Sequence, residues 1–133
     1  MIEEVFHVKL PVNESLSLKR NRFLPPDITQ STRRISIVTG IHGDELEGQY
    51  VCYLLAKWLN ENPEKIKGII DIYPSMNPMG IDSITRGFPF YDVDINRAFP
   101  GGTSDFLPAQ LAHAIVESVK GSDFAIDIHS SNI

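Results

Sequence analysis

A strand, a helix and a second strand follow one another in the middle of the chain, and this order restricts the fold more than any other feature. Residues 35–38 are a short β-branched run that ends at Thr39-Gly40, which is typical of a buried strand followed by a turn. Residues 68–73 predict the second strand. Because a crossover helix between two such strands makes them parallel partners in one sheet, the pattern predicts the α/β fold class.

The connecting helix is predicted from Asp44 to about Asn60. Asp44, Glu45 and Glu47 would lie in its first turn, where the helix dipole favours negative charge. We interpret Cys52 as a small packing residue of this helix rather than as a nucleophile. Apolar side chains recur at spacings of three and four residues and predict one buried face. This stripe consists of Leu46, Tyr50, Val51, Leu54, Leu55 and Trp58.

Further elements are predicted on both sides of this unit. Residues 5–8 indicate a first strand, and the Pro-containing stretch 11–32 is expected to be irregular. Residues 74–103 form a polar passage with many Gly and Pro residues, which is unusually long for a loop without a function. A second amphipathic helix is predicted at about residues 106–120, and Phe124–Ile128 predicts a third strand. The stripe of the second helix consists of Leu107, Leu111, Ile115 and Val119.

Length, charge and cysteine content exclude several classes of protein. The 133 residues suit a single domain, and the net charge of -5 argues against binding to a nucleic-acid backbone. No apolar run approaches the roughly eighteen residues of a membrane span, and the first ten residues do not resemble a secretory signal. Cys52 is the only cysteine, which excludes an internal disulfide and fits a reducing compartment. We therefore expect a cytoplasmic enzyme or binding module.

His42 and Glu45 lie three residues apart at the junction between the strand 35–38 and its helix. Ligand-binding groups of α/β proteins are often found at such junctions. An imidazole nitrogen and a carboxylate oxygen at this spacing can both bind a metal ion if the turn folds them inward. The pair alone is a weak signal, because a histidine in a turn beside acids that begin a helix gives the same spacing.

The third strand ends in Asp127-Ile128-His129 and so offers a second histidine at a strand terminus. If both strands belong to one parallel sheet, His42 and His129 converge at the same edge. Taken alone, His129 is also compatible with a strand-end histidine whose hydrogen bonds go to the backbone. Two histidines and a carboxylate make a three-ligand zinc site with a fourth position for water, as in hydrolytic centres.

Polar residues of the long loop suit the recognition of a carboxylate. The guanidinium of Arg97 can bind a carboxylate through two hydrogen bonds, and the amide of Asn96 beside it adds a donor. An arginine in a surface loop is often merely solvated. The length of this loop and its Gly and Pro content favour a functional role.

Four motifs in this order resemble the succinylglutamate desuccinylase/aspartoacylase family of the zinc-carboxypeptidase-like superfamily. The resemblance extends over about residues 35–130 and leaves the first thirty or so without a counterpart. It implies a three-layer α/β/α fold with a mostly parallel or mixed sheet. The motifs are His42-Gly43-Asp44-Glu45, Asn77-Pro78-x-Gly80, Asp94-x-Asn96-Arg97-x-Phe99-Pro100-Gly101 and Asp127-x-His129.

The resemblance also implies roles for individual residues. One zinc ion per chain would be held by His42, Glu45 and His129. Arg86 would polarise the scissile carbonyl and stabilise the developing oxyanion. The substrate carboxylate would be bound by Asn96 and Arg97, while Asp94 would accept a hydrogen bond from the non-ligating nitrogen of His42. Asp127 either serves His129 in the same way or is structural.

One residue that the family requires is missing. Family members use a glutamate on a later strand as general base and acid, whereas four residues follow His129 here, and neither Glu47 nor Glu117 is assigned that role. We therefore expect residues 1–133 to be one partial catalytic domain, incomplete at its carboxyl end.

The resulting hypothesis is a zinc-dependent hydrolase of linear amides that acts on a small N-acyl amino acid or similar carboxylate. The alternatives are a metallocarboxypeptidase that acts on peptide C-termini and, without a downstream glutamate, a non-catalytic zinc or carboxylate-binding module. We expect no nucleic-acid or membrane partner. The oligomeric state, monomer or homo-oligomer, stays open.

Overall fold

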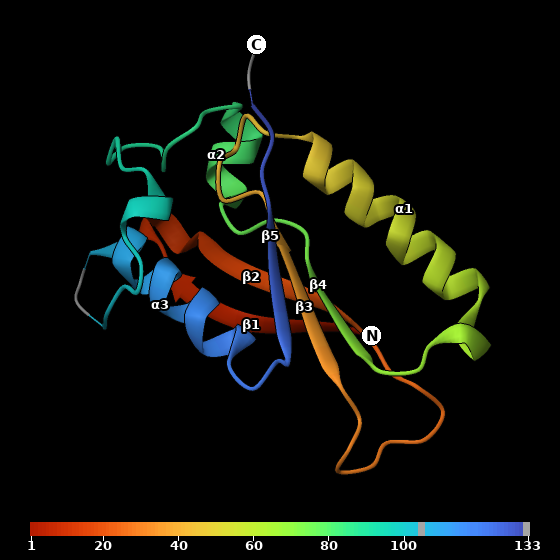
Figure 1. Cartoon of the computed structure of the whole chain (residues 1–133). Helices are drawn as coiled ribbons and strands as arrows, with labels where there is room; N and C mark the ends of the chain where they lie inside the picture. Colours follow the sequence, from red (N-terminus) through yellow and green to blue (C-terminus); the bar gives the residue numbers. More distant parts are fainter. Residues whose placement is uncertain (104–105, 132–133) are drawn as a thin grey trace.

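A mixed sheet of five strands forms the centre of the protein (Figure 1). The computed structural model describes residues 1–103 and 106–131. In the strand order β1-β2-β4-β3-β5, β3 (Arg34–Thr39) pairs in parallel with β4 (Ile69–Tyr73) and with β5 (Phe124–Ile128). β2 (Ser15–Phe23) runs antiparallel to β4, and β1 (Ile2–Lys9) antiparallel to β2. The parallel pairing of β3 with β4 confirms the predicted strand-helix-strand unit.

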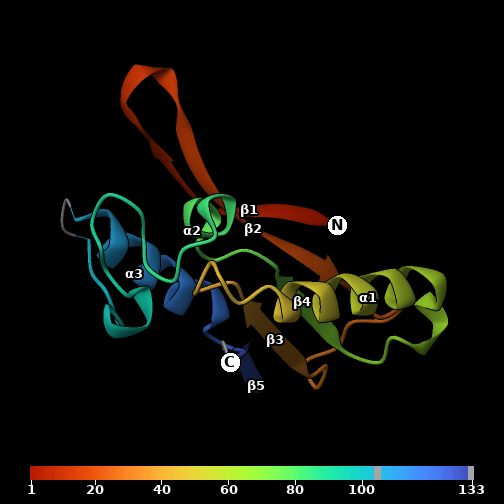
Figure 2. The ribbon, with the colours of Figure 1, turned by 90° about the horizontal axis from the view of Figure 1, so that it is seen from above.

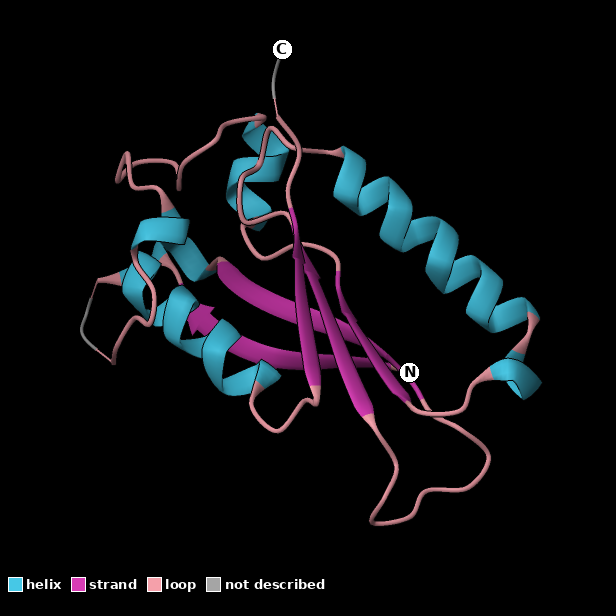
Figure 3. Ribbon diagram, viewed as in Figure 1, coloured by secondary structure: helices cyan, strands magenta, loops and turns pink. Residues whose placement is uncertain are grey.

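Helices cover both faces of the sheet, so the three-layer α/β/α arrangement is also confirmed (Figures 2 and 3). α1 (Glu47–Glu61) packs on one face and α3 (Leu107–Val119) on the other. Within the described residues, none of the helices combines the length and apolar character that a membrane span requires. The shorter helical segments are α2 (Pro78–Ser83) and the 3-10 turns η1 (Pro11–Asn13), η2 (Pro63–Lys65) and η3 (Ile95–Arg97).

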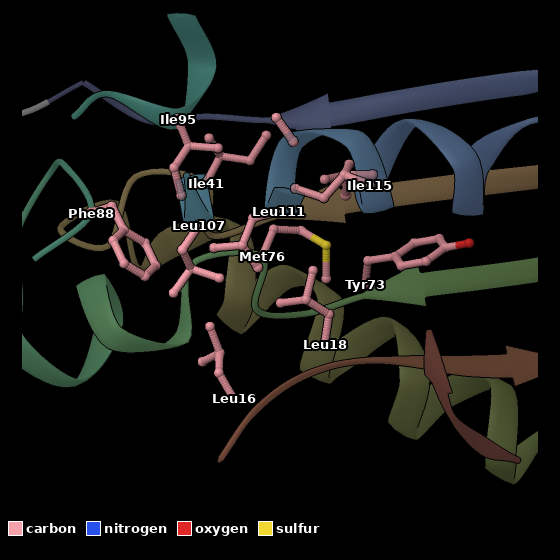
Figure 4. Close-up of a cluster of buried hydrophobic side chains, with 12 residues drawn as sticks. Leu16, Leu18, Ile41, Tyr73, Met76, Phe88, Ile95, Leu107, Leu111 and Ile115 are labelled. Carbon is pink, nitrogen blue, oxygen red and sulfur yellow. The ribbon is translucent and has the colours of Figure 1, made fainter. Parts of the chain in front are cut away.

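The face beneath α3 carries the larger hydrophobic core (Figure 4). Leu107, Leu111 and Ile115 of α3 are buried there, and Val119 packs against them, as the apolar stripe of this helix predicts. They meet the buried side chain of Leu18 from β2. The cluster also extends into the long passage between β4 and α3, since Met76, Phe88 and Ile95 are fully buried in it.

The prediction for the amino-terminal region is wrong in two respects. The first strand is longer than residues 5–8, and the stretch expected to be irregular contains β2. Leu16 and Leu18 of β2 face the core, but the next two positions on the same face are Arg20 and Arg22. Because charged residues occupy inward positions, this part of β2 lacks the alternation of apolar and polar residues that predicts a strand.

The prediction for the first helix is wrong about its start and its buried face. The helix begins at Glu47, so that Asp44 and Glu45 precede it. Cys52 is buried as predicted, but the predicted stripe is largely exposed, with Tyr50 64% and Trp58 45% accessible. The helix instead packs through a face of smaller side chains. This face consists of Gly48, Cys52, Leu55, Ala56 and Leu59.

Gly48 explains why α1 packs on the sheet through this face. A Cβ atom at position 48 would overlap the hydroxyl of Thr39 at the end of β3 and crowd Ile128 of β5. The helix can therefore approach the two strands closely only with a glycine at this contact. The spacing of large apolar residues therefore does not predict a buried face that consists of small side chains.

A buried carboxylate in the middle of β4 joins three strands through arginines, one of which, Arg34, begins β3. Asp71 on β4 is fully buried and accepts two hydrogen bonds of 2.7 Å from Arg22 on β2. It also accepts one of 2.8 Å from Arg34 on β3. Burial alone would raise the pKa of Asp71, but the hydrogen bonds from Arg22 and Arg34 outweigh it and lower the pKa below its usual value.

Substitution of this carboxylate tests its contribution to stability. Asp71→Asn leaves the arginines without their buried counter-charge and should lower the free energy of unfolding by about 3 kcal/mol at pH 7. Since the folded-state pKa of Asp71 is depressed, the ionic contribution is complete above an unfolded-state pKa of about 3.9. It is lost as the pH falls through the lower folded-state pKa, so the deficit of the variant should shrink in acid.

Urea unfolding at pH 7 and pH 3, followed by the fluorescence of Trp58, measures both effects. Asp27→Asn provides the matched control because Asp27 is exposed. Equal stability of the two variants at pH 7 would contradict the role assigned to Asp71.

Candidate metal centre

His42 and Glu45 lie in the turn that connects β3 with α1, and both side chains are buried. The turn directs both side chains inward, so that Nδ1 of His42 is 2.8 Å from Oε1 of Glu45. The two side chains therefore face the same point beyond the carboxyl end of β3.

His129 reaches this point from the neighbouring strand. The parallel register pairs Thr39 of β3 with Ile128 of β5, which brings the segments after the two strands to the same edge. Nδ1 of His129 is 2.9 Å from Oε2 of Glu45 and 3.1 Å from Nδ1 of His42. One ligand atom from each of the three residues lies within 4.8 Å of the others. The two histidines thus meet where the sequence pattern predicts.

Each histidine has a carboxylate of its own on the side away from this cluster. Nε2 of His42 is 3.0 Å from Oδ1 of Asp94, and Nε2 of His129 is 2.9 Å from Oδ2 of Asp127. A carboxylate accepts a hydrogen bond from the N–H that it faces and so favours the tautomer with the proton on Nε2. Both Nδ1 lone pairs are then directed at Glu45, which is the arrangement that a metal site requires.

Hydrogen bonds also adjust the charge states of the cluster. Burial raises the pKa of Glu45, but the backbone N–H of Ser130, at 3.0 Å, and the two histidines outweigh it and lower the pKa below its usual value. Burial lowers the pKa of His129, while its contacts with Asp127 and Glu45 prevail and raise it. Glu45 is therefore held as a carboxylate, the form that binds a cation.

The donor set fits zinc. Two imidazole nitrogens and one carboxylate oxygen are the ligands of many catalytic zinc sites, and bonds of about 2.0–2.2 Å place tetrahedral ligands roughly 3.4 Å apart. The three separations of 2.8, 2.9 and 3.1 Å are a few tenths of an ångström shorter. Small side-chain movements are enough to admit the ion.

An open cavity of about 480 Å³ adjoins the cluster. Nη1 of Arg86 donates a hydrogen bond of 3.0 Å to Oε1 of Glu45, and Asn96 also lines the cavity. Arg97 is 88% exposed and lies 3.7 Å from Asp94, outside the set that lines the cavity. The lining consists of His42, Asp44, Glu45, Arg86, Asn96, His129, Ser130 and Ser131.

Asp44, Ser130 and Ser131 are the lining residues that the sequence analysis did not assign to the site. Asp44 stands inside the first motif and was read as a helix-start acid, although it precedes the helix. Ser130 contributes its backbone N–H, a group that every residue but proline carries. Only its place directly after His129 could have indicated it.

The glycines of the first two motifs hold the turn of His42 and Glu45 against α2. A Cβ atom at Gly43 would overlap the backbone carbonyl of Gly80 in α2. The backbone N–H of Gly43 donates to the carbonyl of Thr85 at 3.0 Å, just beyond this helix. The fully buried side chain of Asn77 accepts from the N–H of Gly80 and donates to the carbonyl of Ile41. The two motifs are therefore one packed unit beneath the cluster.

Comparison with known proteins agrees with this geometry. The sequence profile of the succinylglutamate desuccinylase/aspartoacylase catalytic domain matches residues 31–133. The chain belongs to the succinylglutamate desuccinylase/aspartoacylase family. No curated protein matched the chain in a sequence comparison.

Solved structures of this family share the fold. An aspartoacylase family protein from Mesorhizobium loti is 29% identical, with a TM-score of 0.77 over 96% of this chain and 40% of its own. A succinylglutamate desuccinylase/aspartoacylase from Rhodobacter sphaeroides is also 29% identical, with a TM-score of 0.79 over 97% of this chain and 40% of its own.

Carboxypeptidases share the same architecture. A metallo-carboxypeptidase from Burkholderia cenocepacia is 18% identical, with a TM-score of 0.74 over 98% of this chain and 36% of its own. At this identity the likeness concerns the fold alone. The chain spans about two fifths of the length of the two family structures.

The packing of Gly43 against Gly80 predicts the effect of an added methyl group. Gly43→Ala forces two backbone segments apart and should lower the free energy of unfolding by about 1–3 kcal/mol. Urea unfolding of the metal-free protein measures it. Gly102→Ala is the control, because a Cβ atom at that position meets nothing within 4 Å. A Gly43→Ala variant as stable as Gly102→Ala would show that the contact is not tight.

Proposed function

We propose that the protein is a zinc-dependent hydrolase that cleaves a linear amide bond of a small N-acyl amino acid or similar carboxylate-bearing substrate. The observation that carries this proposal is the convergence of His42, Glu45 and His129, with Asp94 and Asp127 on the outer histidine nitrogens. Family membership supports hydrolysis as the reaction class. Because the chain spans about two fifths of its solved relatives, the proposal concerns the activity of the whole protein.

Zinc, when bound, supplies a Lewis acid that polarises a carbonyl group and makes hydroxide available near neutral pH. His42, Glu45 and His129 would hold it. Their outer partners Asp94 and Asp127 bind Nε2 of each imidazole and fix its orientation, so that Nδ1 faces the cluster.

Arg86 stands where it can act on the carbonyl group of a substrate. Its guanidinium contacts Glu45 and is about half exposed to the cavity, so donors remain available beside the cluster. When the carbonyl oxygen gains negative charge in the transition state, a fixed guanidinium stabilises it more than it stabilises the substrate.

Asn96 and Arg97 would bind the free carboxylate and so set the position of the scissile bond. Asn96 lines the cavity, and its backbone N–H donates to Asp94, which links this segment to His42. Arg97 is 88% exposed, and its ion pair with a described residue is the long one of 3.7 Å to Asp94, so its side chain can turn toward an incoming carboxylate. We place the reaction in the cytoplasm, in keeping with the single buried cysteine.

Metal analysis of the purified protein is the first test. We expect about one zinc per chain, removed by a chelator, and an affinity more than about a hundredfold weaker in His129→Ala. His7→Ala removes an exposed histidine of β1 and should bind zinc normally. Equal affinity in both variants would refute the metal site.

Hydrolysis is tested on the natural full-length protein with a panel of N-acyl amino acids and short peptides. The proposal requires cleavage of N-acyl amino acids that stops on chelation and returns with zinc. Cleavage of peptides alone would favour a metallocarboxypeptidase. Zinc binding without any hydrolysis would favour a non-catalytic binding module.

The two outer carboxylates give a finer prediction. Asp94→Asn and Asp127→Asn should each weaken zinc binding by about tenfold or more, because an amide orients the imidazole less strongly than a carboxylate. Asp82→Asn, an exposed position on α2, is the control. Unchanged zinc affinity in one variant would restrict the role to the other aspartate.

A further inference from the structure

A second cavity, of about 490 Å³, opens at the opposite end of the sheet from the candidate metal centre. Arg34, which lines it, begins β3, whereas His42 follows the carboxyl end of the same strand. Arg20 and Arg22 of β2 line the cavity beside Arg34, and Lys120 lines it from the end of α3. Four basic side chains thus surround one hollow.

The charges of this cluster are unevenly distributed. The three guanidinium groups share two carboxylates, the buried Asp71 and the partly buried Glu3. One positive charge therefore remains among these five groups. At the rim Glu117 pairs with Lys120, and Glu4, which lies 3.6 Å from His7, also lines the cavity. With His7 neutral the eight charged groups balance, so the excess positive charge is local to the three arginines.

Two of the arginines keep donor capacity for a ligand. Arg22 uses Nε and Nη2 on Asp71, while its Nη1 is 3.8 Å from Glu3, which is too long for a hydrogen bond. Arg20 uses Nε and Nη2 on Glu3, and its Nη1 is 3.7 Å from Asp71. Arg34, by contrast, donates hydrogen bonds from Nε, Nη1 and Nη2 to Asp71, to Tyr73 and to the carbonyls at the end of α3.

The guanidinium groups are also fixed before any ligand arrives. Arg20 and Arg22 are 17% and 21% exposed, and the buried carboxylate holds them from behind. Much of the free-energy cost of ordering and desolvating these long side chains is therefore already included in folding and does not reduce the binding affinity. Guanidinium groups held in this way bind oxyanions through paired hydrogen bonds.

We propose that this cavity binds a small anion through a carboxylate or phosphate group, with Arg20, Arg22 and Lys120 as its contacts. The site is separate from the proposed hydrolytic centre and does not depend on zinc.

Titration of the isotope-labelled protein with inorganic phosphate, and separately with acetate, tests the proposal at constant ionic strength. We expect saturable shifts of the backbone amide signals of Arg20, Arg22 and Lys120 in two-dimensional NMR spectra. The anion that saturates at the lower concentration identifies the preferred group. Signals of residues 42–45 and 94–97 report any separate binding at the metal centre.

Three variants make the result specific. Arg20→Gln should weaken binding by about tenfold or more, since it removes a charge-assisted hydrogen bond. Lys120→Gln lies on the exposed rim, leaves the buried network intact and should weaken binding by about two- to fivefold. Lys19→Gln removes the same charge from the other face of β2 and should change nothing.

The proposal is overturned if the shifts do not saturate, or if they are confined to residues 42–45 and 94–97. It is also overturned if Lys19→Gln weakens binding as much as Lys120→Gln. If Arg20→Gln fails to fold, the comparison of these two lysine variants decides the question by itself.

Discussion

The parallel pairing of β3 with β5 is the contact on which the rest of the site depends. It brings two chain segments to one edge of the sheet, so that the residues after Thr39 and after Ile128 emerge side by side. Glu45 then lies 2.8 and 2.9 Å from Nδ1 of the two histidines and accepts hydrogen bonds from Arg86 and from the backbone of Ser130. A shift of one residue in the register would turn His129 to the other face of the sheet.

The two faces of the sheet are stabilised in different ways. Beneath α1 the packing depends on small side chains, because Gly48 must pass close to Thr39 and Ile128. Beneath α3 the carboxyl ends of the strands carry a hydrophobic core, while the other end carries the ionic cluster around Asp71. The metal centre and the basic cavity thus lie at opposite ends of one scaffold.

Sequence patterns predicted the parts of the protein in which one strong local signal acts alone. The strands β3, β4 and β5, the helix α3 and the convergence of His42 with His129 are of this kind. β2 was not predicted, because Arg20 and Arg22 occupy inward positions whose partner, Asp71, is about fifty residues away in the chain. The face of α1 was misjudged because large apolar residues such as Trp58 remain exposed when a smaller face packs more closely. The orientation of Arg97 depends on side-chain contacts that a spacing cannot express.

The separation of the candidate metal ligands along the chain has a consequence for folding. His42 and His129 are 87 positions apart, and His129 directly follows β5, which is synthesised after β3 and β4. A complete ligand set therefore exists only after β5 has docked beside β3, and the unfolded chain offers no comparable site. An ion that binds only the assembled state stabilises it by mass action, so metal supply would set the fraction of chains that stay folded.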